Sequence, residues 1–377
     1  MSEKDLDLKL RLMRFLWYKG YFIRRNINLL RFSYGGKTNQ AYTDIDVLGL
    51  KIDDGFNPTW IVCDCKSGQK AKNTDRIFRL SGVMKYLHAE SGIFLRKEVM
   101  ESRYVELARK LEITPLSLNQ LSELEKIYNI DSRPYVGVFN KDTVDKDVHI
   151  FNKLKKDNPP VYYYLDFKYW VDPVQQRIKS LIHSGTKIEK SDNIKEDDKM
   201  FLKTYLLTLL ANSILEFSSY VLILPKEEKE YHIRENLMGG RIESAERKQL
   251  FEAFYDFLSK EVSIRSGKEY PVNRNEFKSH FYPKYLKYLV DLVERVCYKP
   301  LAAVYVPRLL DVLTYEVILD NKSKDIINEV FSYDQNFSLI ETSKLVKDFF
   351  TFGQRTDILS EEENQYLKDI INKLELE

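Results

Sequence analysis

Two short segments of this sequence combine acidic and basic side chains at a spacing suited to phosphate chemistry. The first carries Asp44 and Asp46, and the second carries Asp64 and Lys66. Side chains two residues apart on a strand point to the same face, so each pair shares a face. If the segments pair as neighbouring strands, we expect Asp46, Asp64 and Lys66 to converge at one end. Two carboxylates and a lysine on a rigid edge suit a hard cation together with a phosphate group.

Both segments have the composition of β-strands. Residues 43–49 and 60–68 are rich in β-branched and apolar residues, and the turn-forming residues 53–58 separate them. A hairpin is therefore predicted. The apolar residues just before Asp64 are unusual for an edge strand, so the second strand is expected to be central, with Cys63 pointing into the core.

The surrounding pattern predicts the elements that hold this hairpin. A helix is expected over residues 5–19, ended by Gly20, and a strand over residues 21–30. Beyond the hairpin, Asp75 is expected to cap a helix. The further elements are a helix over 76–89, a strand over 92–96, a helix over 99–111, a strand over 113–118 and a helix over 119–128. This order predicts an α/β fold in which helices cover a mixed sheet.

The length of 377 residues favours two domains, with a boundary near residues 131–134. We predict domains over 1–130 and 131–377, the second mostly helical. Strands are expected at 135–139 and 161–167, an exposed linker at 186–200, and helices at 200–224, 245–261, 283–297, 308–319, 342–351 and 360–374. Phe251, Phe254 and Phe257 fall at helical spacing, which favours core packing over base stacking.

Charge is balanced overall but unevenly distributed. Lys and Arg number 59 against 57 acidic residues, so net charge says little about partners. Residues 66–110, however, carry eleven basic side chains against five acidic ones, and residues 1–40 are also basic. A basic surround attracts polyanions. An ordinary solvated helix face explains the same pattern equally well.

Compartment signals in the sequence point to the cytoplasm. Three cysteines, an odd number, argue against a disulfide framework, and the N-terminus lacks a signal-peptide pattern. The apolar run at 201–224 contains Lys203 and Glu216, so a buried helix is favoured over a membrane span. We therefore expect a soluble protein in a reducing compartment, without a membrane partner.

Asp46 followed by the strand-borne Asp64-Cys65-Lys66 resembles the D…(D/E)xK pattern of the PD-(D/E)xK nuclease superfamily. Residues 20–26 and 44–47 are similar to the Holliday-junction-resolvase-like and Mrr-like branches. The resemblance covers about residues 1–130. It implies a restriction-endonuclease-like mixed sheet flanked by helices, with an αβββαβ core, followed here by a mostly α-helical C-terminal domain.

The resemblance implies a role for each matching residue. Asp46, Asp64 and the carbonyl of Cys65 would bind Mg²⁺ or Mn²⁺, and Lys66 would orient the attacking water and stabilise the charged phosphate. Asp44 would be a further catalytic carboxylate. Many relatives add an acid from the first helix, but Asp5 and Asp7 lie about one turn early here. The nucleic-acid contacts implied are Lys70, Arg76, Arg79 and Tyr86.

The function implied is an Mg²⁺-dependent endonuclease acting on DNA, in a defence or restriction-type role. The C-terminal half would serve recognition, homodimerisation or binding of a partner protein. An alternative is a catalytically inactive nuclease fold that binds nucleic acid or scaffolds an assembly, and RNA is an alternative substrate. Asp64 and Lys66 could also be an ordinary surface pair of small energetic value.

Overall fold

The computed structural model describes residues 3–31, 40–68, 72–268 and 282–375. An N-terminal sheet of five strands takes the spatial order β1-β2-β3-β4-β5. The two pairings among β1, β2 and β3 are antiparallel, and the pairings of β3 with β4 and β4 with β5 are parallel. The strands are β1 (Phe22–Arg31), β2 (Gln40–Ile52), β3 (Pro58–Lys66), β4 (Ser91–Arg96) and β5 (Ile113–Ser117).

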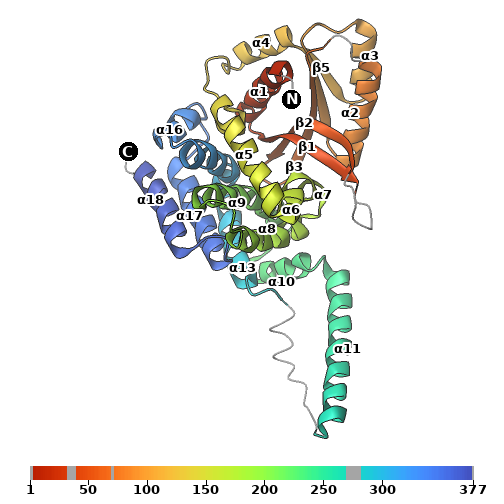
Figure 1. Ribbon diagram of the computed structural model, residues 1–377, viewed down its shortest axis with the longest axis vertical. Coiled ribbons are helices and arrows are strands. Elements are labelled where there is room, and N and C mark those ends of the chain that lie inside the picture. The colour runs from red at the N-terminus through yellow and green to blue at the C-terminus, as the bar shows by residue number, and fades with distance from the viewer. Residues whose placement is uncertain (1–2, 32–39, 69–71, 269–281, 376–377) are drawn as a thin grey trace.

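Helices cover both faces of this sheet. Figure 1 shows α1 (Glu3–Tyr18) and α4 (Leu118–Ile127) to one side, and α2 (Asn73–Leu87) and α3 (Ser102–Lys110) to the other. The predicted order of helices and strands is confirmed. One detail was wrong, because α2 begins at Asn73 and Asp75 therefore lies in its first turn instead of capping it.

Burial explains why β3 lies in the middle of the sheet. Six consecutive residues from Trp60 to Cys65 are buried, as predicted for a central strand. Helix α1 contacts β1 and β3, and its residues Leu10, Met13 and Trp17 are buried. Their spacing of three or four residues places them on one helical face.

The rest of the chain is almost entirely helical. The longest buried helix is α9 (Glu196–Ser218). Among the described residues it is the one helix long and apolar enough to cross a membrane, and 89% of its most apolar segment is buried inside the protein. The helices are α5 (Lys141–Asp157), α6 (Pro159–Tyr163), α7 (Tyr169–Val171), α8 (Val174–Glu189), α9 (Glu196–Ser218), α10 (Lys226–Leu237), α11 (Arg241–Ser266), α13 (Leu286–Tyr298), α14 (Pro300–Ala303), α15 (Val306–Val312), α16 (Asp325–Phe331), α17 (Leu339–Arg355) and α18 (Glu361–Glu375), with a 3₁₀ turn η1 (Gly137–Phe139) and π-helices η2 (Tyr164–Lys168) and η3 (Leu313–Leu319).

Both strands predicted in this half were wrong. Residues 135–139 contain the 3₁₀ turn η1, and residues 161–167 belong to α6 and η2. Pro159 and Pro160 open α6, where the missing N–H groups of proline cost nothing. A short apolar run does not by itself distinguish a buried helix from a strand.

The predicted exposed linker at 186–200 was also wrong. Helix α8 continues to Glu189 and α9 begins at Glu196, and the short connection is held down by buried Ser191 and Ile194. The prediction that Phe254 and Phe257 pack in a core was wrong as well. Both lie on α11, where they are exposed.

The sheet and the helical half pack on one another. Arg24 on β1 lies 2.8 Å from Asp311 on α15, and both side chains are buried. Trp17 of α1 contacts Phe331 of α16, with ring centroids 5.6 Å apart. Buried apolar residues from Leu8 to Leu374 form one cluster, so both predicted domains contribute to a common core.

Candidate active site

The register of the hairpin brings the predicted carboxylates together. Val47 on β2 pairs with Cys63 on β3, and the same register carried one residue further sets Asp46 opposite Asp64. The backbone N–H of Cys65 donates to Asp46 Oδ2 at 2.8 Å, and Lys66 Nζ lies 3.3 Å from that oxygen. Asp46, Asp64 and Lys66 therefore meet at one end of the hairpin.

Asp64 is held in a setting that leaves its charge poorly compensated. Its side chain is 9% exposed. Arg76 Nη1 lies 3.4 Å from Oδ2, whereas the buried Oδ1 has no hydrogen-bond partner in the described chain. Burial and, next, the charge of Asp46 raise the pKa of Asp64 to about 6. An additional cation beside Oδ1 would stabilise the ionised form.

Lys9 is a member of this site that sequence reasoning missed. From α1, its Nζ lies 2.6 Å from Asp46 Oδ1, and both side chains are 4% exposed. The same ammonium donates to Asn26 Oδ1 at 2.8 Å. Lys9 lies one helical turn after Asp5, so the two share the helix face that reaches the end of the hairpin. That spacing is a signal in the sequence, but it does not show that Lys9 is buried against Asp46.

The two acids of α1 have different surroundings. Asp5 Oδ1 accepts hydrogen bonds from the N–H of Ser67 at 3.0 Å and from its hydroxyl at 2.6 Å. Burial alone would raise the pKa of Asp5, but these bonds and the charges of Lys66 and Lys9 outweigh it and lower the pKa. Asp7 is exposed. Of the two, Asp5 borders the site, through the residue that follows Lys66.

Asp44 pairs with Arg79 instead of joining the buried carboxylates. Arg79 Nη2 lies 2.7 Å from both Asp44 Oδ1 and the Asp44 carbonyl. Burial would raise the pKa of Asp44, but the hydrogen bond from Arg79 outweighs it and the pKa is lowered. Tyr86, further along α2, is exposed. Lys70 lies outside the described residues.

The residues at this site fit a cation that needs few protein ligands. Mg²⁺ is commonly held by one or two carboxylates, with water and substrate oxygens completing its shell. Asp46 and Asp64 supply two carboxylates, and the described chain has no group of three or more His, Cys, Asp or Glu side chains placed to hold a metal. The thiol of Cys65 is buried, which raises its pKa; the ligand expected from Cys65 is its backbone carbonyl.

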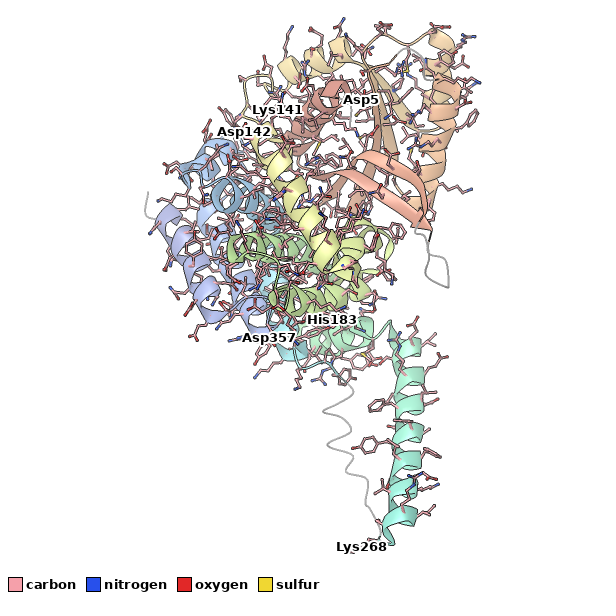
Figure 2. All side chains as sticks on the ribbon, viewed as in Figure 1. Asp5, Lys141, Asp142, His183, Lys268 and Asp357 are labelled. Atoms are coloured by element: carbon pink, nitrogen blue, oxygen red, sulfur yellow. The ribbon has the colours of Figure 1, made fainter. Side chains whose placement is uncertain are left out.

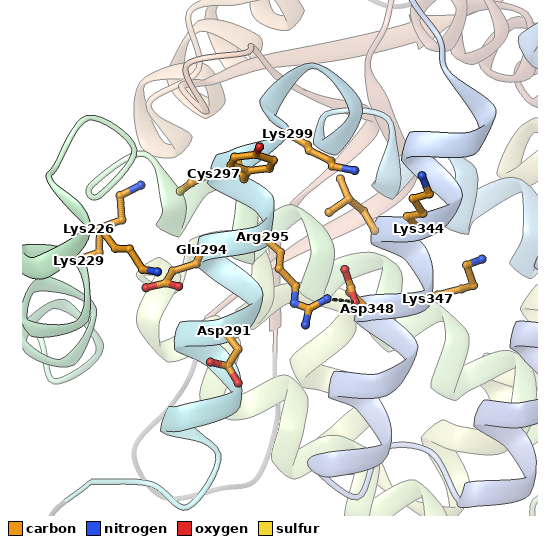
Figure 3. A pocket seen from close by; sticks show the side chains of 12 residues that line it. Lys226, Lys229, Asp291, Glu294, Arg295, Cys297, Lys299, Lys344, Lys347 and Asp348 are labelled. Carbon is orange, nitrogen blue, oxygen red and sulfur yellow. Dashed lines mark hydrogen bonds and ion pairs between the residues drawn. The ribbon is translucent and has the colours of Figure 1, made fainter.

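A hollow lies far along the chain from the hairpin, among α10, α13 and α17. Figure 3 shows basic side chains around it, including Lys226, Lys229 and Lys347. Arg295 is paired with Asp348 at 2.9 Å, and burial raises the pKa of the Cys297 thiol. Six basic and three acidic side chains line this hollow, and Lys299 and Lys344 both pair with Glu341.

Comparison with protein-family models, curated proteins and solved structures found no match to this chain.

Proposed function

We propose that this protein is an Mg²⁺-dependent endonuclease that hydrolyses DNA, with a restriction-endonuclease-like core in its N-terminal part. The observation that carries the proposal is the meeting of Asp46, Asp64 and Lys66 at the end of a central hairpin. Asp64 Oδ1, which has no hydrogen-bond partner among the described residues, adds to it, because a buried carboxylate oxygen without a donor is costly unless a cation binds there.

Each residue has a distinct role in this proposal. Asp46 and Asp64 hold the metal, which when bound acidifies a water and neutralises the phosphate. Lys66, partly exposed beside Asp46, orients the water and stabilises charge on the phosphate oxygens. Arg76 and Arg79 on α2 bind flanking phosphates, since both reach the same end of the hairpin through Asp64 and Asp44.

Cleavage assays test this proposal. Wild-type protein is expected to cut supercoiled or branched DNA with Mg²⁺ and to stop when the metal is chelated. Lys66→Met is expected to lower the cleavage rate about 10²- to 10³-fold, the usual effect of losing one charge-stabilising group. Lys51→Met is the matched control, because Lys51 is an exposed lysine at the other end of β2. Equal rates for wild type and Lys66→Met would refute the proposal.

The second candidate is a nuclease-like scaffold that binds nucleic acid without cutting it. The Lys9–Asp46 ion pair favours this reading, because an ammonium group already neutralises one of the two carboxylates. The scaffold would show salt-dependent DNA binding and no turnover. Titration with Mg²⁺ separates the candidates, since only the enzyme requires the metal at Asp46 and Asp64. Parallel assays on RNA identify the substrate.

A further inference from the structure

Helix α11 carries large apolar side chains into solvent. Figure 1 shows it running away from the helical body beyond α10, and Figure 2 labels Lys268 just past its far end. Leu250, Phe254 and Leu258 are 76%, 56% and 42% exposed. Exposed apolar side chains grouped on one face mark an interaction surface.

These side chains belong to a row, here called the α11 stripe, whose residue spacing is the same on both sides of Phe254. Its members follow one another at intervals of 4, 3, 4, 4, 3 and 4 residues. Intervals of three and four keep residues on one helical face. The stripe consists of Glu243, Arg247, Leu250, Phe254, Leu258, Glu261 and Arg265.

The order of residue types makes the α11 stripe complementary to the same stripe of a second copy that runs antiparallel to it. When a second copy lies antiparallel with the two Phe254 side chains together, Leu250 meets Leu258. Arg247 of one copy then meets Glu261 of the other, and Glu243 meets Arg265. A parallel pairing in register would instead set like charges opposite each other, and facing charges decide helix orientation in this way.

We propose that two copies of this protein form a homodimer through an antiparallel pairing of their α11 stripes, with a two-fold axis at Phe254. Such an interface is isologous, so one helix supplies both halves. Within each helix Arg247 lies 3.1 Å from Glu243, and Arg265 lies 3.6 Å from Glu261. At each end of the apolar centre the pairing therefore joins two such ion pairs into a four-charge group. This inference does not depend on the proposed nuclease activity.

Sedimentation equilibrium of the full chain over a range of concentrations tests the dimer. Wild type is expected to reach twice the chain mass of 44.7 kDa. Phe254→Glu is expected to remain a monomer, because it sets two carboxylates against each other on the axis. Gln249→Glu is the matched control, since it adds the same charge to an exposed position on the other side of α11 and should still dimerise.

Two charge-reversed variants that dimerise only when mixed would identify the antiparallel orientation of the two helices. Arg247→Glu alone and Glu261→Arg alone each set like charges together and are expected to weaken dimerisation. Mixed in equal amounts, the two variants are expected to form a heterodimer, because both contacts are then complementary. Positions 247 and 261 are about 21 Å apart along one helix, so the rescue must act between copies. Circular dichroism verifies that each variant is folded. A monomeric wild type, a monomeric mixture, or loss of the dimer in Gln249→Glu would overturn the proposal.

Discussion

Replacing Lys9 with methionine removes the ammonium group that lies 2.6 Å from Asp46 Oδ1 inside the protein. Methionine keeps the length of the side chain and its apolar contacts. The change leaves the buried carboxylate of Asp46 with fewer compensating charges. Breaking a buried pair by removing one partner costs about 3–5 kcal/mol. We expect the lower end, about 3 kcal/mol, because the Cys65 N–H and Lys66 still contact Asp46 Oδ2.

A metal is also expected to take over the role of Lys9. Mg²⁺ at ten times its dissociation constant should return about 1.4 kcal/mol of the lost stability. Removing the competing ammonium should tighten Mg²⁺ binding relative to wild type. Urea unfolding with and without Mg²⁺ measures both effects.

A double variant provides the control for this experiment. Lys9→Met combined with Asp46→Asn removes the stranded charge, so it should be more stable than Lys9→Met alone and should gain nothing from Mg²⁺. Such non-additivity is expected of residues in direct contact. A loss below about 1 kcal/mol for Lys9→Met, or equal gains from Mg²⁺ in both variants, would refute the reasoning.

Three further predictions concern Asp64, Arg79 and the buried pair Arg24–Asp311. Because the pKa of Asp64 is raised to about 6, protons compete with metal below that pH, so Mg²⁺ affinity measured by calorimetry should rise about tenfold per pH unit up to 6 and then level off. Arg79→Met should weaken DNA binding and reduce the slope of log affinity against log salt by about 1, and an unchanged slope would exclude a phosphate contact. Arg24→Met leaves Asp311 buried without its partner and should cost about 3–5 kcal/mol in one cooperative urea transition, whereas two separate transitions would show that the halves unfold independently.

The hairpin could be predicted from sequence because its signals are local. Alternation along the two strands and the turn between them determine which residues share a face, and the register follows from the hydrophobic pattern. The meeting of Asp46 with Asp64 and Lys66 required no information from distant parts of the chain. The α-β-β-β-α-β-α-β order could be predicted for the same reason. Apolar residues recur every second residue in strands and every third or fourth in helices, so the spacing changes where one element ends and the next begins.

The spacing after Asp5 places Lys9 on the helix face that reaches the hairpin, but its pairing with Asp46 could not be predicted because it arises from tertiary packing. A lysine on an amphipathic helix is by default a solvent-exposed residue. Only the docking of α1 against the sheet brings it to Asp46 and buries it. Likewise, the carboxylate of Asp44 was grouped with Asp46 by spacing, but α2 supplies Arg79 as a nearer partner.

In the helical half, tertiary packing overrides the secondary-structure preference of short segments. Residues 161–167 are rich in aromatic and β-branched types, yet they form helix, and η2 packs beside β1. The helical spacing of Phe251, Phe254 and Phe257 correctly predicted the helix now seen as α11. Spacing reveals that a face is apolar, but what covers that face depends on the rest of the fold, and here Phe254 and Phe257 remain exposed.

Anomalous diffraction from a crystal soaked with Mn²⁺, which substitutes for Mg²⁺, tests whether Asp46 and Asp64 hold a metal. We expect a single anomalous peak between the carboxylates of Asp46 and Asp64, with the Lys9 ammonium displaced from Asp46 Oδ1. A crystal with no peak there, and with Lys9 still bound to Asp46 at saturating Mn²⁺, would contradict this expectation.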